Sequence, residues 1–296
     1  LENVSDNSGT EYNLCVPLKT DVSGQINYII KAHDDNTGET TQSVVINIDS
    51  TKPGMYTTSG AESENIGSNL RLKSLGKNLG TSSGNSTVVN SDSYFTFGDT
   101  VSEAGSGLAF VVAVFERSGT TGGRRIYNPM KKDTKLSLAE NETEASISKK
   151  PYISAEGFAV QQFDVERPSE DSIKSAKFAE SANGAFIQKG GLVRIAGTYC
   201  LITDFDSSIG KITLSKSVSG KFTTAEIIFG QVIDHQIVET FKADGTVEND
   251  DGDGMCETIR QLGASYTWTA SVDSTNIPDG PINIHVVAID NAGNTN

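Results

Sequence analysis

The chain has 296 residues, of which 36% are hydrophobic, 7% are aromatic and 29 are glycine. At roughly 100–200 residues per domain this length predicts two or three domains, and recurring β-branched runs exclude a fully disordered chain. The 24 basic and 38 acidic residues give a net charge of −14. This charge excludes nucleic-acid binding through a general basic field, and no apolar run reaches the length of about 18 residues that a membrane span needs.

The first well-marked element is an alternating stretch at residues 24–38, GQINYIIKAHDDNTG. Its period of two predicts a half-buried strand, and the Asp, Asn and Gly residues that follow are typical of a tight turn. A further strand is predicted at residues 43–49, and Pro53 then ends ladder pairing. Residues 1–53 therefore resemble the last strands of a β-sandwich rather than a whole one.

A long loop is predicted at residues 54–91, which are rich in Gly, Ser and Asn. The next strands begin near residue 92, and Phe110–Glu116 is a dense apolar run that predicts a buried strand. The strand near Tyr266 that would continue this sandwich lies roughly 150 residues later, whereas such a sandwich takes about 100 residues in all. The surplus predicts an insertion.

The predicted insertion is itself rich in short strands. Four of them follow at even spacing, at residues 191–197, 199–205, 211–215 and 224–229. This spacing predicts a small β-barrel or an added sheet. Residues 168–182 predict a helix instead, because Pro168 suits its first turn and the acidic residues after it complement the helix dipole.

An acidic stretch at residues 244–257, DGTVENDDGDGMCE, is the best candidate for a metal site. A calcium ion takes about six to eight oxygen ligands, which clustered carboxylates beside a glycine turn can supply. Arg260 stands where an EF-hand loop has Glu, so a solvated acidic loop is the alternative. The predicted Ca²⁺ ligands are Asn249, Asp251, Asp253 and Glu257, and no other cofactor is predicted.

The most informative feature is an internal repeat. Residues 280–293, GPINIHVVAIDNAG, match residues 24–38 at a constant offset of 256. The shared positions are Gly24/Gly280, Ile26/Ile282, Asn27/Asn283, Ala32/Ala288 and Asp34/Asp290. The same strand and turn are therefore predicted twice in the chain.

These motifs resemble the closing strands of bacterial immunoglobulin-like repeats, in which a strand of the form Y-x-I-x-A-x-D precedes a last strand ending V-D-x-T-x-P. The matching pieces here are Tyr28–Asp34, Ile48–Pro53 and Val287–Asn294. The resemblance implies an all-β fold of tandem immunoglobulin-like sandwiches, the second interrupted by a mostly-β insertion. The implied plan is the end of a first repeat at 1–53, a second repeat at 54–120 and 238–296, and the inserted domain at 121–237.

No catalytic constellation is visible in the sequence, so the chain is not expected to be an enzyme. The three His residues show no zinc-ligand spacing, and Asp234-His235 lacks a Gly-x-Ser-x-Gly nucleophile motif. Three cysteines, Cys15, Cys200 and Cys256, fit no complete disulfide framework. Bridges from Cys256 to Cys15 or Cys200 remain open, but unpaired, partly buried thiols are favoured.

The resemblance implies a structural or adhesive segment of an extracellular or cell-surface protein. Its expected partners are neighbouring repeats or identical subunits, and a host or cell-surface glycan or protein; no nucleic acid is expected. Two alternatives stay open: a lectin-like glycan- or protein-binding module in the insertion, and a filament or surface-layer subunit that assembles by strand complementation. The first copy of the repeat continues into the strand at 43–49, so a following repeat or a neighbouring molecule is expected to supply that strand to the second copy.

Overall fold

The computed structural model of the chain describes residues 3–5, 12–14, 23–34, 38–55, 71–74, 77–81, 94–118, 123–139, 150–234, 239–242, 247–249, 255–278, 280 and 282–296. The chain divides into two compact units, residues 1–51 and residues 52–296. The predicted all-β class is confirmed, because the described segments form antiparallel sheets with only short helical turns. None of the described helices has the length and apolar character to cross a membrane.

The first unit holds two separate hairpins in its described part. Their strands are β1 (Asn3–Ser5) with β2 (Tyr12–Leu14), and β3 (Gly24–Asp34) with β4 (Gly38–Ile48). β3 and β4 pair over their whole length, which confirms the strand, turn and second strand predicted at 24–49. No other described strand pairs with either of them.

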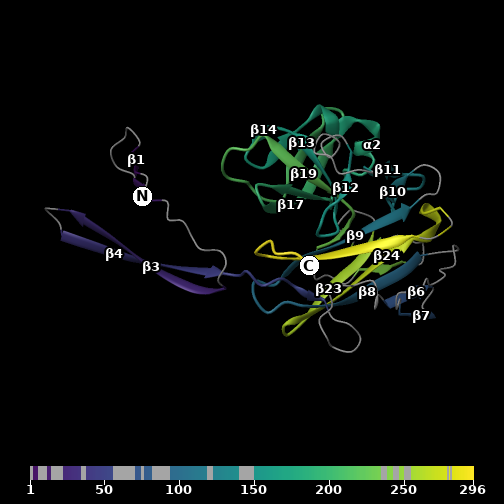
Figure 1. The fold of residues 1–296 in the computed structure, drawn as a ribbon, viewed down its shortest axis with the longest axis horizontal. Helices are drawn as coiled ribbons and strands as arrows, with labels where there is room; N and C mark the ends of the chain where they lie inside the picture. The colour runs from purple at the N-terminus through teal and green to yellow at the C-terminus, as the bar shows by residue number, and fades with distance from the viewer. Residues whose placement is uncertain are drawn as a thin grey trace. The chain divides into compact units, whose positions relative to one another are not determined.

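The second unit is built on a sandwich of two antiparallel sheets (Figure 1). The outer sheet has the order β23-β24-β8-β6-β7, with β5 beside β6 on the same edge of β8. Its strands are β5 (Gly54–Met55), β6 (Arg71–Ser74), β7 (Lys77–Thr81), β8 (Tyr94–Ser102), β23 (Cys256–Leu262) and β24 (Ser265–Asp273). A short turn, η3 (Ser274–Asn276), follows β24.

The other sheet of the sandwich is centred on β9. This strand pairs with β25 along one edge and with β10 and β20 along the other, and β10 pairs in turn with β11. The strands are β9 (Leu108–Ser118), β10 (Arg124–Tyr127), β11 (Lys135–Ser137), β20 (Gln231–Ile233) and β25 (Asn283–Asp290). A small separate hairpin joins β21 (Thr240–Phe241) to β22 (Val247–Glu248).

Aromatic side chains fill the space between the two sheets of the sandwich. Trp268, which is fully buried, lies edge-on to Phe97 at 5.8 Å between ring centroids, and Phe97 lies edge-on to Phe115 at 5.7 Å. Gly98 permits the close approach of the β8 and β24 backbones, because a Cβ there would lie 2.2 Å from the Trp268 carbonyl oxygen. Alternation along β8 and β24 therefore directs one face of each strand into the core.

A third sheet is inserted between β11 and β20. Its eight strands are ordered β12-β13-β19-β16-β17-β18-β15-β14, and the described strands do not close into the barrel that was one of the two predicted forms. The strands are β12 (Tyr152–Ile153), β13 (Ala159–Asp164), β14 (Glu166–Ser169), β15 (Ser172–Lys174), β16 (Leu192–Ile195), β17 (Thr198–Asp206), β18 (Lys211–Leu214) and β19 (Thr224–Phe229). The range 121–237 that was predicted as the insertion therefore belongs to two sheets. β10, β11 and β20 pair within the sandwich, and the strands from β12 to β19 form the third sheet.

The helix predicted at residues 168–182 is wrong. Glu170 and Asp171 form the turn of a hairpin between β14 and β15, where the Ser169 hydroxyl donates to Asp171 Oδ1 at 2.6 Å. The hydrogen bonds of this turn therefore outweigh the favourable interaction that the acidic residues would make with a helix dipole. β15 also pairs with β18, and its Ile173 is buried. Only η2 (Ala176–Ala179) and α2 (Ser181–Gly184) are helical in this region.

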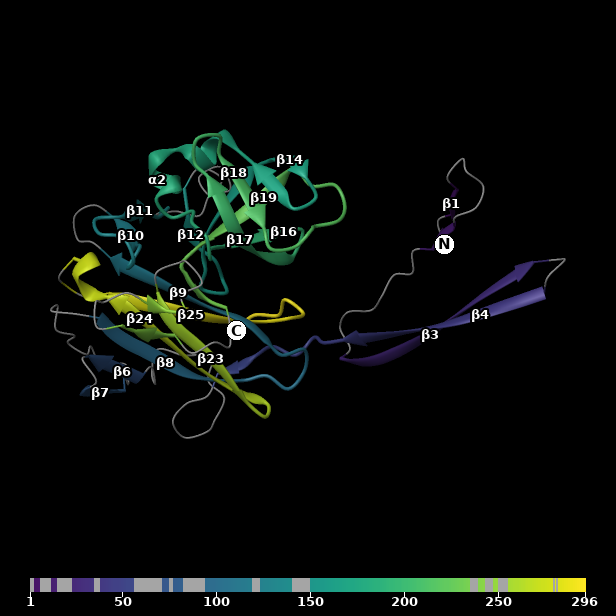
Figure 2. The ribbon, with the colours of Figure 1, turned by 180° about the vertical axis from the view of Figure 1, so that it is seen from behind.

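The β9–β25 sheet is the middle layer of the second unit. In Figures 1 and 2 the inserted strands lie on one side of it and β8 and β24 on the other. Val111, Ala113 and Phe115 pack into the sandwich core, whereas Val112 and Val114 belong to the core shared with the inserted sheet. Burial on both faces explains why the run Phe110–Phe115 is continuously apolar instead of alternating.

The repeated motif forms the same hairpin in both units. In the first copy Ala32 lies opposite Thr40 and His33 opposite Glu39. In the second copy Ala288 exchanges two backbone hydrogen bonds with Asn296, at 3.0 and 3.2 Å, and Ile289 bridges Thr295. Adding 256 to each residue number of the first copy gives the pairs of the second, so the two turns have one register.

Candidate functional site

The predicted calcium loop is only partly within the described residues. Asp251 and Asp253 lie outside them. Asn249 is exposed just after β22, with a positive φ of 60° that asparagine tolerates. Glu257 lies in β23, is 1% exposed and donates its backbone N–H to Glu239 Oε2 at 2.8 Å. The calcium site at these residues stays a prediction.

Glu257 shares its surroundings with a second buried carboxylate and a cysteine. Glu239 is 4% exposed, and Cys256 is a free, buried cysteine, as is Cys200. Burial, with a smaller contribution from the Glu239 carboxylate, raises the pKa of the Cys256 thiol to about 11. Burial also raises the pKa of the Cys200 thiol, so both thiols are protonated at neutral pH. Both cysteines are free and buried, which confirms the predicted unpaired packing for these two; Cys15 lies outside the described residues.

An ionic cluster joins three strands of the middle layer. Glu116 on β9 accepts hydrogen bonds from Arg124 Nε on β10 at 2.6 Å and Arg124 Nη2 at 3.2 Å. His285 Nε2 on β25 lies 2.6 Å from Glu116 Oε2. The His285 hydrogen bond, helped by Arg124 and opposed by burial, lowers the pKa of Glu116 from 4.5 to about 2. A carboxylate held this strongly in its charged form makes a poor general base. The cluster therefore holds β9, β10 and β25 together, and we call it the Glu116 clamp.

A second ionic cluster crosses the inserted sheet. Arg194 on β16 lies opposite Tyr199 on β17 and opposite Glu226 on β19. Its guanidinium donates to Glu226 Oε2 and, at 3.3 Å, to the Tyr199 hydroxyl. Burial raises the pKa of Tyr199, while the Arg194 hydrogen bond opposes that shift. The three residues are direct cross-strand neighbours, so they stabilise the sheet laterally.

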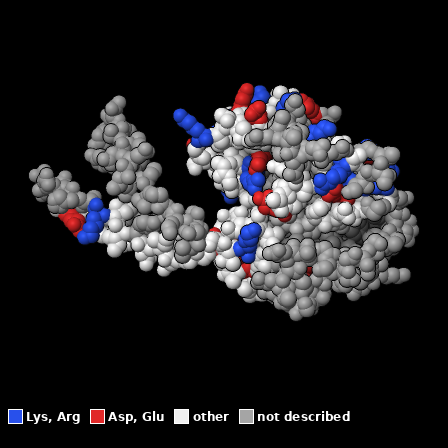
Figure 3. Space-filling model, viewed as in Figure 1, with Lys and Arg blue, Asp and Glu red and all other residues white. Residues whose placement is uncertain are grey.

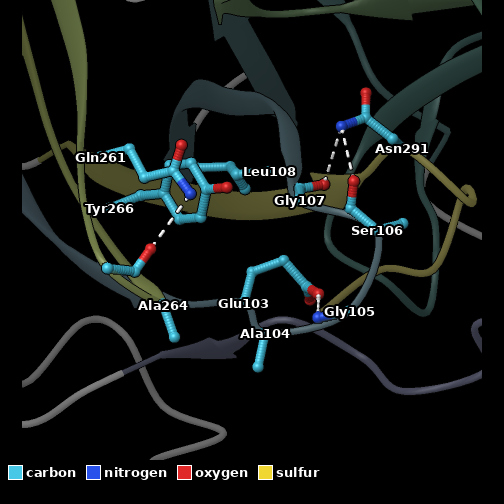
Figure 4. A pocket seen from close by; sticks show the side chains of 11 residues that line it. Glu103, Ala104, Gly105, Ser106, Gly107, Leu108, Gln261, Ala264, Tyr266 and Asn291 are labelled. Atoms are coloured by element: carbon cyan, nitrogen blue, oxygen red, sulfur yellow. Dashed lines mark hydrogen bonds between the residues drawn. The ribbon is translucent and has the colours of Figure 1, made fainter.

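An open pocket of about 590 Å³ lies where the β8–β9 and β23–β24 turns meet Asn291 (Figure 4). Asn291 Nδ2 donates to the carbonyl oxygens of Ser106 and Gly107 at 3.0 and 3.1 Å, and the Gly105 N–H donates to Glu103 Oε1 at 2.6 Å. The pocket's polar groups are thus used to hold its own turns together.

Two buried carboxylates meet at this end of the sandwich. Glu103 is 4% exposed and Asp290 is 2% exposed, and their carboxylate oxygens lie within 4.8 Å of each other. Asp290 accepts the backbone N–H and the side-chain amide of Asn294, both at 2.8 Å. Two neighbouring carboxylates repel each other when both are ionised, which a bound cation would relieve. The sequence identified Asp290 chiefly as a turn residue, with metal binding as the alternative, and did not identify Glu103.

Charges on the described surface are mixed in sign. On the face drawn in Figure 3, acidic and basic side chains of the second unit lie interspersed. The hairpin of β3 and β4 has several exposed apolar side chains close together: Ile29 is 64%, Val45 55%, Ile30 44% and Val44 36% exposed, whereas the second unit exposes the separate side chains Leu262 and Ile209. The surface of this hairpin is therefore the clearest candidate for contact with another chain.

The chain matches no protein-family model, no curated protein and no solved structure. The functional conclusion therefore depends on the residues themselves.

Proposed function

We propose that this chain is a structural or adhesive segment of a repetitive extracellular surface protein, and that it acts without catalysis. The observation that supports the proposal is the reuse of one hairpin in one register, at residues 24–40 and again at residues 280–296. Repetition of a small β unit is typical of arrays that hold a binding surface at a distance. The resemblance to bacterial immunoglobulin-like repeats agrees with this role.

The construction of the second unit suits a part that bears load. The inserted sheet shares its core with Val112 and Val114 of β9 and with Val287 and Ile289 of β25. Gly230 lets the chain return from the insertion close to β9, since a Cβ there would lie 2.8 Å from Val112 Cγ1. The sandwich and the insertion are therefore one packed body, which would present any binding surface rigidly to neighbouring repeats, identical subunits or a cell-surface glycan or protein.

Surface labelling tests the proposed location. Antibodies raised against residues 52–296 should label intact, unpermeabilised cells of the source organism, and a protease added outside those cells should remove the signal. An antibody against a cytoplasmic protein serves as the permeability control. Labelling that needs permeabilised cells would contradict an extracellular role.

A lectin-like insertion is the competing function, and a glycan array probed with the whole labelled chain separates the two. The structural function predicts no saturable binding by the inserted sheet. Saturable binding of one glycan class that is lost on Arg194→Ala, while Arg167→Ala keeps it, would assign recognition to the middle of that sheet.

Calcium remains part of the proposal as a rigidifying ion. Titration calorimetry of the whole chain with CaCl₂ should show binding that is lost in an Asp251→Asn, Asp253→Asn double variant. An Asp290→Asn variant distinguishes the predicted loop from the carboxylate pair of Glu103 and Asp290. No binding heat in any of the three proteins would remove calcium from the proposal.

A further inference from the structure

Two arginines on the β9–β10 hairpin face each other across the strands. Arg117 on β9 lies directly opposite Arg125 on β10. Directly opposed residues of an antiparallel pair project to the same face of the sheet, with Cβ atoms about 4.5–5.5 Å apart. Like charges in this position destabilise a sheet, so strand formation does not account for the pair.

Neither guanidinium has a partner within the described residues. The ion pairs and side-chain hydrogen bonds there involve neither Arg117 nor Arg125. The adjacent acid on β9, Glu116, projects to the other face of the sheet by alternation, where it accepts hydrogen bonds from Arg124 and contacts His285. Two positive charges thus lie together without a described counterion, in a chain whose 38 acidic residues outnumber its 24 basic ones.

Apolar side chains lie beside the arginine pair on the same face of the sheet. Phe115 and Tyr127 lie opposite each other two residues further along the strands, so they share the face of Arg117 and Arg125. Both aromatic residues are buried in the sandwich core, and both arginines are only partly exposed. Surroundings of low dielectric constant strengthen the attraction between a charge and its counterion. A small anion would therefore be attracted more strongly here than beside fully solvated arginines.

The backbone at Gly280 restricts one of the two guanidinium groups. A Cβ at Gly280 would lie 2.9 Å from Arg117 Cζ and closer still to Arg117 Nη2, so the guanidinium packs directly on this glycine. The equivalent glycine of the first copy, Gly24, has nothing within 4 Å of the same position. This contact limits the conformations that the Arg117 side chain would lose on binding a ligand, which lowers the entropic cost of binding.

We propose that Arg117 and Arg125 form a binding site for one oxyanion group: a sulfate, phosphate or carboxylate. Each guanidinium presents a planar fork of N–H donors that matches an oxyanion, and a shared anion would replace the repulsion between the arginines with two attractions. The oxyanion can be a free inorganic ion or a substituent of an acidic sugar, and the chemistry of the site is the same for both. This inference goes beyond the proposed surface function and does not depend on it, because binding is measured on the isolated chain.

Titration calorimetry of the whole chain at low ionic strength, with sodium sulfate as the probe, tests the site. The original chain should bind sulfate. Arg117→Gln and Arg125→Gln should each weaken the binding by about tenfold or more, because hydrogen bonds to a charged group are lost. The matched control is Arg260→Gln, which changes the net charge equally at an exposed position on β23 and should keep the binding.

Two sugars separate the sources of the oxyanion. N-acetylglucosamine 6-sulfate that binds more tightly than free sulfate, while unsulfated N-acetylglucosamine does not bind, supports the site with an acidic sugar as its ligand. Equal affinity for free sulfate and for the sulfated sugar supports the site with the oxyanion alone as its ligand. Both affinities should fall in Arg117→Gln and Arg125→Gln.

Thermal unfolding followed by fluorescence of Trp268, the single tryptophan, provides a second readout. Without sulfate, Arg125→Gln should be at least as stable as the original chain, because it removes the repulsion and keeps the contact of Arg117 with Gly280. Sulfate stabilises proteins in general, so the test is whether it raises the Tm of the original chain more than that of Arg125→Gln. An equal rise in Tm would overturn the proposal, as would a titration without binding heat or sulfate binding that neither arginine substitution changes.

Discussion

The two copies of the repeated strand share a pattern and a hairpin register, but they have opposite surroundings. Val286 in β25 is 6% exposed, whereas its equivalent Ile30 in β3 is 44% exposed. Val287 is 1% exposed, whereas its equivalent is Lys31, whose side chain is 60% exposed. The comparison teaches that the motif encodes a strand and its turn, while the neighbouring strands decide how deeply it is buried.

Exchanging Lys31 and Val287, which are equivalent in the two copies, gives the largest expected effect on stability. Val287→Lys would place an ammonium group among the apolar side chains of the core that the middle layer shares with the inserted sheet. Burial of an unpaired charge is among the few changes that cost about 4 kcal/mol or more. Guanidinium unfolding followed by fluorescence of Trp268, the single tryptophan, should show this loss in the second unit.

The reciprocal change is the control. Lys31→Val removes only a surface ion pair with Glu39, at 2.8 Å, and such pairs contribute about 0–1 kcal/mol. The Trp268 unfolding curve should be unchanged, because Lys31 is in the first unit. Equal losses from the two substitutions would mean that the copies do not differ in burial as described.

Removal of an isoleucine side chain from each copy, at positions that are not equivalent in the repeat, should give the next largest difference. Ile289 is fully buried in the core that β25 shares with the inserted sheet, so Ile289→Ala should destabilise the second unit by about 2–5 kcal/mol. Ile29→Ala, at a position 64% exposed, should leave the Trp268 transition within about 0.5 kcal/mol of the original. A small effect at Ile289 would show that the inserted sheet does not pack on β25.

The strands were predicted from the sequence, but the exposure of the first copy was not. Alternation at 24–34 predicted a half-buried strand, whereas β3 exposes Ile29 on one face and Ile30 on the other. The apolar run that begins at Phe110 predicted a buried strand, and β9 is buried. The Glu116 cluster was not predictable in this way, because His285 is 169 residues from Glu116 along the chain. Only the register of β9 with β25 brings them together. The helix at 168–182 failed because its acidic residues suit a hairpin turn as well as a helix start.

The Glu116 clamp gives the second copy a pH dependence. The pKa of Glu116 is lowered from 4.5 to about 2, so its stabilising effect is present above pH 4.5 and is lost as the pH falls toward 2. At about 1.4 kcal/mol per pH unit this amounts to at most about 3 kcal/mol. Unfolding followed by Trp268 between pH 5 and pH 2 should show the loss, and Glu116→Gln should start less stable and respond less to acid. If the free energy of unfolding falls equally steeply with pH in the original chain and in Glu116→Gln, Glu116 does not cause the pH dependence.

The smallest expected effect concerns the turn itself, where the residue at the last turn position differs between the copies. Gly38, with φ of 87°, is replaced in the second copy by Asn294, whose backbone and side-chain N–H groups both donate to the buried Asp290 carboxylate. Asn294→Gly keeps the backbone bond and removes the side-chain bond, so it should cost about 1 kcal/mol. Faster exchange of the Ala288 and Asn296 amides should accompany the loss, since these two residues close the hairpin. If the substitution leaves both exchange rates unchanged, the turn is held by its backbone alone, and the two copies close their hairpins by the same means despite their different burial.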